Sequence, residues 1–248
     1  MNELLLIGSV VLIFGTVILA YKLFGKAGLF CVSAIATVLA NIEVIILVKA
    51  FGMEQTLGNV LFASTFLITD ILSECEGRKE ANKAVTMSIF VSVFFLLLSQ
   101  SWLLYVPSAG DTMMPSIKAV FSNTPRMILA SLVVYVVSQF FDVWLYHKWW
   151  AFTEKRFGDK RKFLWLRNNG STLVSQIINT LLFTLFAFWG TYDLKTIGSI
   201  FISSYVIYVV TSLLDTPFVY LARHIHDKKT KENLCCLLYT SPSPRDCS

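Results

Sequence analysis

The sequence predicts an all-α fold: a polytopic bundle of about seven transmembrane helices, formed by a single domain over residues 1–235. Of the 248 residues, 55% are hydrophobic and only 15% are charged, whereas soluble domains carry roughly a quarter charged residues. Several apolar runs also reach the roughly 18–20 residues that cross a bilayer as a helix. Composition and run length therefore both indicate an integral membrane protein.

Seven apolar segments are predicted as spans, in chain order 4–21, 27–48, 58–72, 85–106, 127–146, 171–189 and 197–221. The first segment lacks a preceding basic region and a small-residue cleavage site, so it is predicted to be a span and not a signal peptide. The third segment is short and polar at its end, so it could enter the membrane without crossing it. A bundle of six spans is therefore the alternative.

The distribution of Lys and Arg over the loops supports seven spans. Sixteen of these residues occupy the loops after the first, third and fifth spans and the flank after the seventh, whereas four occupy the opposite side. Cytoplasmic loops accumulate Lys and Arg. We therefore expect the N-terminus outside and the C-terminus in the cytoplasm, because six spans would place two basic loops on the wrong side.

Residues 236–248 do not fit the rest of the chain. The segment CLLYTSPSPRD within them is what a common sequencing adapter gives when it is translated in one frame. We interpret residues 236–248 as an artefact that is not native, which removes Cys236 and Cys247 from consideration. The other cysteines show no metal-ligand spacing and are expected to be small apolar fillers or idle thiols.

Polar side chains within the spans are candidates for function, because lipid cannot satisfy them. Asp70 and Glu74 end the third span, either as a solvated helix end or as part of a site. One face of the fifth span carries Tyr135, Ser138, Gln139, Asp142 and Tyr146. This face is predicted to line a cavity, and the alternative is that Asp142 pairs with Lys148.

The sixth and seventh spans carry similar polar faces. The sixth is preceded by Arg167, Asn168 and Asn169 and carries Ser171, Thr172, Ser175, Gln176 and Asn179, the last four in one stripe. This stripe must face protein, a cavity or a substrate. On the seventh span, one stripe is formed by Ser204, Tyr208, Thr211 and Asp215. Asp215 either binds a ligand or pairs with Arg167, and Pro217 is predicted to bend or break the helix nearby.

Enzymatic chemistry is not predicted. The sequence lacks HExxH, GxSxG and a glycine-rich phosphate loop. The three histidines, His147, His224 and His226, all lie in cytoplasmic flanks. We therefore expect no catalytic residue, no metal and no cofactor, and the loop location of the basic residues gives no reason to expect nucleic-acid binding.

Four segments, TDILSE, FDVWLYHKWW, LWLRNNGSTLVSQIINTLLF and LLDTPFVY, together resemble the YhhQ-type queuosine precursor transporter family of vitamin-uptake-like transporters. The resemblance runs from about residue 40 to residue 220. It implies import of 7-cyano-7-deazaguanine and/or 7-aminomethyl-7-deazaguanine through the bacterial inner membrane for tRNA modification. The residues then expected to bind the substrate are Asp70, Glu74, Gln139, Asp142, Arg167, Asn168, Asn169, Ser171, Thr172, Ser175, Gln176, Asn179 and Asp215.

The chemistry of a deazaguanine agrees with this set. The base is flat, with donors at N1 and the 2-amino group and an acceptor at O6. A carboxylate such as that of Asp142 or Asp70 can accept from the donor edge, and the amides of Gln139, Gln176 and Asn169 can serve O6 or the nitrile. Tyr or Phe rings can stack on the base.

The chain departs from the family pattern at three positions. Asn179 stands where many members have Asp, Tyr208 stands where many have Lys, and Glu76 precedes Gly77 where Tyr is usual. Our hypothesis is that the Asp and Lys form an intramembrane ion pair that is lost here as a unit. Removing one partner alone would strand a buried charge, whereas removing both can be nearly neutral.

Two other functions are alternatives. The protein could be a substrate-capturing subunit that needs a separate energising module, although the helices show no convincing stripe of small residues for docking. It could also be a structural membrane protein whose polar stripes pair internally. The partners expected under the leading hypothesis are a deazapurine and the lipid bilayer, with a homo-oligomer left open.

Overall fold

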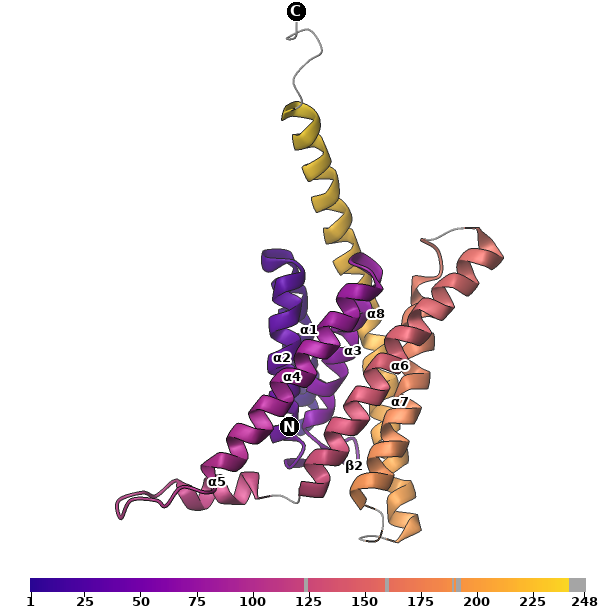
Figure 1. The fold of residues 1–248 in the computed structure, drawn as a ribbon. Coiled ribbons are helices and arrows are strands. Elements are labelled where there is room, and N and C mark those ends of the chain that lie inside the picture. Colours follow the sequence, from indigo (N-terminus) through magenta and orange to yellow (C-terminus); the bar gives the residue numbers. More distant parts are fainter. Residues whose placement is uncertain (123–124, 159–160, 189, 191–192, 241–248) are drawn as a thin grey trace, which may run out of the picture.

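Long apolar helices account for most of the chain (Figure 1). The structure is a computed structural model that describes residues 1–122, 125–158, 161–188, 190 and 193–240. Within these residues the helices are α1 Asn2–Phe24, α2 Lys26–Glu43, α3 Gly58–Cys75, α4 Arg78–Trp102, α5 Met114–Phe121, α6 Pro125–Phe157, α7 Leu164–Phe188 and α8 Leu194–Thr240. Two short antiparallel strands, β1 Leu47–Ala50 and β2 Met53–Thr56, form a hairpin between α2 and α3. The predicted all-α bundle is confirmed.

Six of the described helices, α1, α2, α4, α6, α7 and α8, are long and apolar enough to cross a membrane. Large apolar side chains are exposed along them, as expected where a helix faces lipid. On α1 and α8 these include Leu4, Leu5, Val11, Leu12, Ile202, Val206, Val210 and Leu213. The protein is therefore a multi-pass membrane protein.

The helix α3 lies at the centre of the bundle, where it contacts α1, α2, α4, α6 and α8. Every residue from Gly58 to Ser73 except Phe62 is buried. At 1.5 Å per residue, its 18 residues extend about 27 Å, close to the thickness of a hydrocarbon core. The polarity that makes this segment a weak span in the sequence is thus explained by contact with protein on all sides.

The loops collect at two ends of the bundle. The N-terminus lies beside the hairpin, where the Asn2 side chain donates to the Lys49 carbonyl at 2.9 Å. At the opposite end, the Lys26 amine lies 3.4 Å from Glu80, and Lys229 donates to the Lys22 carbonyl at 2.6 Å. We call these the hairpin end and the basic end. The loops that the sequence placed on one side of a membrane therefore meet in space.

Glycines allow the tight turns and close helix contacts at these ends. Gly77 follows the last turn of α3 with φ of 89°, and its N–H donates to the Leu72 carbonyl at 2.8 Å. A glycine with positive φ commonly follows a helix end in this way. Gly28 packs so closely that an added Cβ would lie 2.4 Å from the Ala20 carbonyl oxygen. The first two helices therefore approach each other through backbone contact.

Several helix bounds differ from the predicted spans. The helix α2 ends at Glu43, five residues before the predicted end, because residues 47–50 pair in β1, and α4 spans Arg78–Trp102 in place of residues 85–106. The helix α6 continues to Phe157, and α7 begins at Leu164, so Arg167, Asn168 and Asn169 are already helical. Pro217 does not break α8, which continues to Thr240. Of the segment interpreted as an artefact, residues 241–248 lie outside the described residues.

Candidate functional site

A cavity of about 760 Å³ lies at the hairpin end. Its walls come from α2, α3, α4, α6, α7, α8 and the hairpin, and none of the described residues that line it is charged. The lining residues are Thr37, Ala40, Asn41, Val44, Ile45, Leu47, Gly52, Gln55, Thr56, Gly58, Asn59, Phe62, Ser92, Ser131, Leu132, Val134, Tyr135, Asn179, Thr180, Phe183, Thr184, Thr196, Ser199, Ile200, Ser203, Ser204 and Tyr208. The cavity can therefore accept a neutral solute with polar edges.

Aromatic rings form one part of the cavity wall. The Phe62 ring lies 5.9 Å from the ring of Tyr135 and 6.1 Å from that of Tyr208, measured between centroids. These residues come from α3, α6 and α8, so the cluster joins three helices. Such a wall offers a face against which a flat heterocycle can pack.

Three buried polar atoms of the lining have no hydrogen-bond partner among the described residues: Gln55 Oε1, Asn59 Nδ2 and the Tyr135 hydroxyl. The carbonyl oxygen of the Asn59 side chain accepts from the Tyr208 hydroxyl and from Thr56, each at 3.1 Å. These two contacts fix the amide and leave its N–H₂ group available. An unpaired acceptor and an unpaired donor thus line the same cavity, which is the arrangement that a polar ligand can complete.

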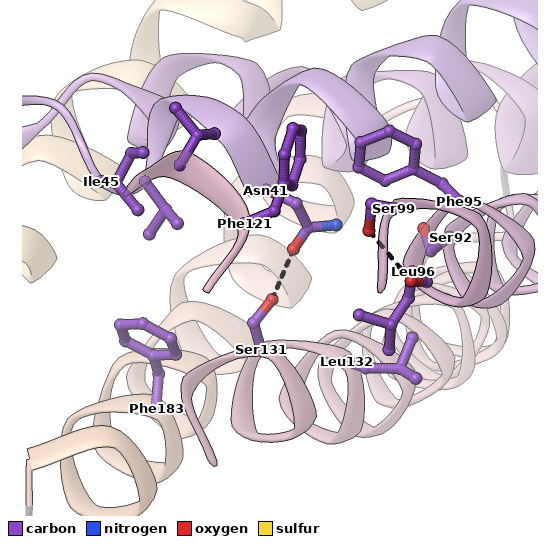
Figure 2. A pocket seen from close by; sticks show the side chains of 12 residues that line it. Asn41, Ile45, Ser92, Phe95, Leu96, Ser99, Phe121, Ser131, Leu132 and Phe183 are labelled. Atoms are coloured by element: carbon purple, nitrogen blue, oxygen red, sulfur yellow. Dashed lines mark hydrogen bonds between the residues drawn. The ribbon is translucent and has the colours of Figure 1, made fainter. Parts of the chain in front are cut away.

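A smaller pocket of about 50 Å³ adjoins the cavity and shares part of its wall (Figure 2). The Ser131 hydroxyl donates to Asn41 Oδ1 at 2.8 Å, and Asn41 donates to the Thr37 carbonyl at 2.9 Å. The Asn41 side chain of α2 therefore has its hydrogen-bond partners inside the protein. The rest of this pocket is largely apolar.

The predicted site residues lie deeper than this cavity. Of the thirteen, only Asn179 lines it, and the others lie toward the basic end on α3, α6, α7 and α8. The predicted polar faces do meet one another. They form three successive layers of contacts beneath the cavity.

The first layer joins α3, α6 and α7 directly below the cavity. Gln139 donates to the Thr65 hydroxyl at 2.6 Å, and the Thr69 hydroxyl donates to Gln139 at 3.3 Å. Asn179 donates to Gln176 at 3.1 Å and accepts from the Ser138 hydroxyl at 3.3 Å. These contacts close the path between the cavity and the deeper layers.

The second layer holds three buried carboxyl groups. The Thr172 hydroxyl donates to Asp70 Oδ2 at 3.0 Å, whereas Asp70 Oδ1 and both oxygens of Asp142 have no hydrogen-bond partner among the described residues. Asn168 donates to Asp215 at 2.7 Å. Asp215 thus has an amide partner, while Asp70 and Asp142 are poorly satisfied.

Neighbouring side chains of α7 complete this layer. Asn169 donates to the Thr216 hydroxyl at 2.7 Å and accepts from Ser212 at 3.3 Å. The hydroxyls of Ser171 and Ser175 donate to carbonyl oxygens one turn earlier in α7, at 2.9 and 2.8 Å. The stripe of the sixth span therefore faces protein throughout this layer.

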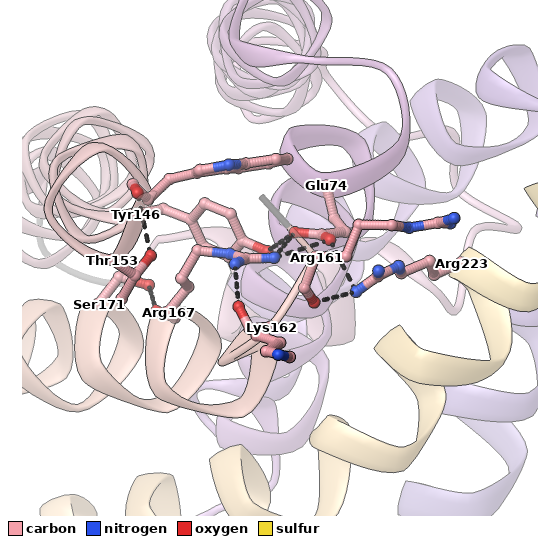
Figure 3. A network of polar contacts seen from close by, with 9 residues as sticks. Glu74, Tyr146, Thr153, Arg161, Lys162, Arg167, Ser171 and Arg223 are labelled. Carbon is pink, nitrogen blue, oxygen red and sulfur yellow. Dashed lines mark hydrogen bonds and ion pairs between the residues drawn. The ribbon is translucent and has the colours of Figure 1, made fainter. Parts of the chain in front are cut away.

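The third layer is an ion-pair network at the basic end (Figure 3). The Arg167 guanidinium contacts both oxygens of Glu74 at 2.8 Å, and the Tyr146 hydroxyl donates to Glu74 at 2.7 Å. Arg223 lies 3.3 Å from the same carboxylate, and the Trp150 ring lies 4.4 Å from the guanidinium carbon of Arg167. We call this network the Glu74 network.

Two alternative pairings from the sequence are therefore corrected. Arg167 pairs with Glu74 in the third layer and not with Asp215. Asp215 instead accepts a hydrogen bond from Asn168. Lys148 lies over the Trp144 ring at 5.4 Å, whereas Asp142 points into the bundle and is fully buried. Asp142 is therefore not a snorkelled surface partner.

Residues 56–222 match a family model described as "Putative vitamin uptake transporter". The matched part begins just before α3 and extends through most of the membrane portion of α8. The chain belongs to this family. The resemblance drawn from the four sequence segments is thereby confirmed.

A curated relative from Bacillus subtilis (strain 168), named "Probable queuosine precursor transporter", is 39% identical over 207 residues. The aligned region covers 84% of this chain and 88% of the relative. No solved structure gives a significant match.

The cavity residues that were absent from the predicted site include Gln55, Asn59 and Phe62. Asn59 stands at the start of an otherwise apolar segment, which is a signal that could have marked it. The acidic residues at the other end of the same helix are the stronger sequence signal for a site. Gln55 lies in a hairpin strand that the sequence analysis did not predict.

Proposed function

We propose that the protein imports queuosine precursors, 7-cyano-7-deazaguanine and/or 7-aminomethyl-7-deazaguanine, across the bacterial inner membrane for tRNA modification. The name of the Bacillus subtilis relative supports this substrate class. In this proposal the hairpin end faces outward and the basic end faces the cytoplasm, in keeping with the excess of Lys and Arg at the basic end. The cavity then receives its solute from outside.

The observation that carries the proposal is the uncharged cavity with its unpaired amide atoms. Gln55 Oε1 can accept from N1–H or the 2-amino group of a deazaguanine, and Asn59 Nδ2 can donate to O6. The aromatic wall at Phe62 supplies a stacking face. The described residues of the lining include no carboxylate, which favours the neutral nitrile over the aminomethyl cation at this position.

Transport requires the three layers below the cavity to open in turn. We propose that the solute binds first beside Asn59 and Asn179 and then passes the amide layer of Gln139 and Gln176. The remaining predicted residues, from Asp70 to Asp215, are proposed to line the path in the state that opens to the basic end. Such an exchange of accessibility around a central site is the general scheme of secondary transporters.

Complementation tests the function. A bacterial strain that neither makes the precursor nor has its own transporter is expected to gain queuosine-modified tRNA from external 7-cyano-7-deazaguanine when it expresses this protein. The empty vector provides the control. Absence of modification with every deazapurine tried, despite membrane insertion of the protein, would reject the proposal.

The cavity assignment has its own prediction. Asn59→Ala removes a buried hydrogen-bonding group and is expected to lower the initial uptake rate at subsaturating substrate about tenfold, since a hydrogen bond to a ligand is worth roughly 1.5 kcal/mol. Asn82→Ala, in the first turns of α4 and outside the cavity lining, is the matched control. Equal uptake by the two variants would show that the cavity is not the binding site.

A further inference from the structure

The buried carboxyl groups of the second layer are not balanced by cations. Glu74 is neutralised by Arg167 and Arg223, but no ion pair to Asp70 or Asp142 is formed by the described Lys and Arg residues. Both residues are completely buried. An ionised carboxylate without a counter-ion is expensive in such surroundings. This layer therefore differs from the Glu74 network, whose charges are matched.

The two carboxyl groups also act on each other. Asp70 on α3 and Asp142 on α6 are close enough to interact electrostatically, and Asp215 on α8 acts on both. Among the described residues, no hydrogen-bond partner is found for three of the four oxygens of Asp70 and Asp142. Two neighbouring carboxylates in an apolar region cannot both be ionised at low cost, so binding of a proton by the pair would relieve their repulsion. The other titratable groups that interact with Asp70 are Glu74, Tyr146 and Asp215.

The position of the pair suits a coupling role. It lies between the amide layer that closes the cavity and the Glu74 network that closes the basic end. It also joins α3 to α6, and Thr172 links it to α7. A change in its charge therefore acts on three helices that must move relative to one another during transport.

We propose that Asp70 and Asp142 form the proton-coupling site of the transporter, an inference that rests on the proposed function. One proton enters from the hairpin end and binds the pair, and its charge neutralisation permits the helices to expose the site to the basic end. The proton then leaves to the cytoplasm together with release of the solute. One proton and one neutral solute cross per cycle, and no bond of the solute changes.

The surrounding groups favour a proton over a metal cation. Within the described residues, no group of three or more His, Cys, Asp or Glu side chains is arranged to hold a metal ion. The helices α3, α6 and α7 are continuous through this layer, so their carbonyl oxygens are engaged in backbone hydrogen bonds. A sodium site in a transporter draws on unwound backbone carbonyls. Two carboxyl groups, by contrast, suffice for a proton.

Reconstitution into liposomes separates coupling from transport. Counterflow exchange of 7-cyano-7-deazaguanine needs no ion gradient, whereas accumulation under an acid-outside gradient needs coupling. For one proton per solute, a pH difference of one unit is expected to support up to about tenfold accumulation. Asp142→Asn is expected to lose this accumulation and to lower exchange far less, because a permanently neutral group cannot carry the proton.

Asp193→Asn is the matched control. This carboxylate precedes α8 outside the membrane, and the Thr196 hydroxyl that donates to it holds its pKa below the usual value. It therefore stays ionised across the range tested, and its replacement is expected to leave accumulation unchanged. Asp142→Glu restores a carboxyl group and is expected to restore accumulation with an altered pH profile.

The outcomes test the proposed function, proton coupling and the assignment of the Asp70–Asp142 pair separately. No exchange by the wild-type protein rejects the proposed function itself. Exchange without accumulation under a pH gradient, or accumulation driven by sodium instead, rejects proton coupling. If Asp142→Asn exchanges poorly, Asp70→Asn takes its place. Loss of exchange in both folded variants, or full accumulation in both, overturns the assignment of the pair.

Discussion

Glu74 illustrates how a membrane carboxylate is made tolerable by its neighbours. It accepts hydrogen bonds from Arg167 and Tyr146 and lies beside Arg223, while its own side chain is only 4% exposed. All of these partners come from helices other than α3. The network therefore fastens α3 to α6, α7 and α8 at the basic end.

Breaking this buried pair is predicted to be costly. Arg167→Met leaves Glu74 buried with fewer partners and is expected to destabilise the protein by about 3–5 kcal/mol. Lys228→Met breaks an exposed pair with Glu232 and is expected to cost no more than about 1 kcal/mol. Unfolding by denaturant in detergent measures both. Similar losses for the two variants would show that the Glu74 network is not structural.

Asn179 and Tyr208 test the proposed loss of an ion pair. Both line the cavity and lie close enough to interact, on α7 and α8. Asn179→Asp introduces a carboxylate without a cation and is expected to reduce transport or folded yield. Adding Tyr208→Lys supplies the cation and is expected to restore them. Uptake and membrane yield of the single and double variants provide the measurement, and a double variant no better than the single one contradicts the pairing.

At the scale of elements, the close contact of α1 and α2 depends on Gly28. A Cβ at this position would meet the Ala20 backbone, so Gly28→Ala is expected to destabilise the protein by about 1–3 kcal/mol through overpacking. Gly15→Ala is the control, since no atom lies within 4 Å of its added Cβ and alanine favours a helix. Melting temperatures should fall for the first variant only. A fall for both would contradict the packing argument.

Apolar runs suffice to predict the existence of the helices but not their ends. Residues 167–169 are polar, yet they are helical because Arg167, Asn168 and Asn169 find partners inside the bundle. Hydropathy falls where a helix enters a polar interior, and it does not distinguish this case from a loop. Helix α6 extends past its predicted end for a related reason, since Trp150 packs over Arg167.

The candidate site could be predicted only in part. The stripe on α7 correctly identifies a face that meets protein, because lipid cannot satisfy its amides and hydroxyls. The cavity itself depends on where helices diverge at the hairpin end, and residue spacing along one helix does not determine that. Asn179 is both a predicted site residue and a cavity residue because it lies where the stripe reaches the cavity.

At the scale of the whole molecule, the structure divides into a hairpin end with a cavity and a basic end that is closed. The described residues of the cavity lining are uncharged, whereas the opposite end is closed by ion pairs and by a hydrogen bond from Arg223 of α8 to the Arg161 carbonyl. This asymmetry is that of a transporter open toward one side. The side of the membrane from which a solute reaches the cavity therefore depends on which end faces the cytoplasm.

The orientation of the protein in the membrane is therefore a prediction that can be tested directly. In a background with all five cysteines replaced by alanine, Ser108→Cys labels the exposed loop before α5, and Lys228→Cys labels α8 beyond the Glu74 network. An impermeant maleimide added to intact cells is expected to modify the first variant only. Permeabilised cells should show modification of both, which controls for accessibility. The reverse pattern would place the cavity on the cytoplasmic side and reject the proposed orientation.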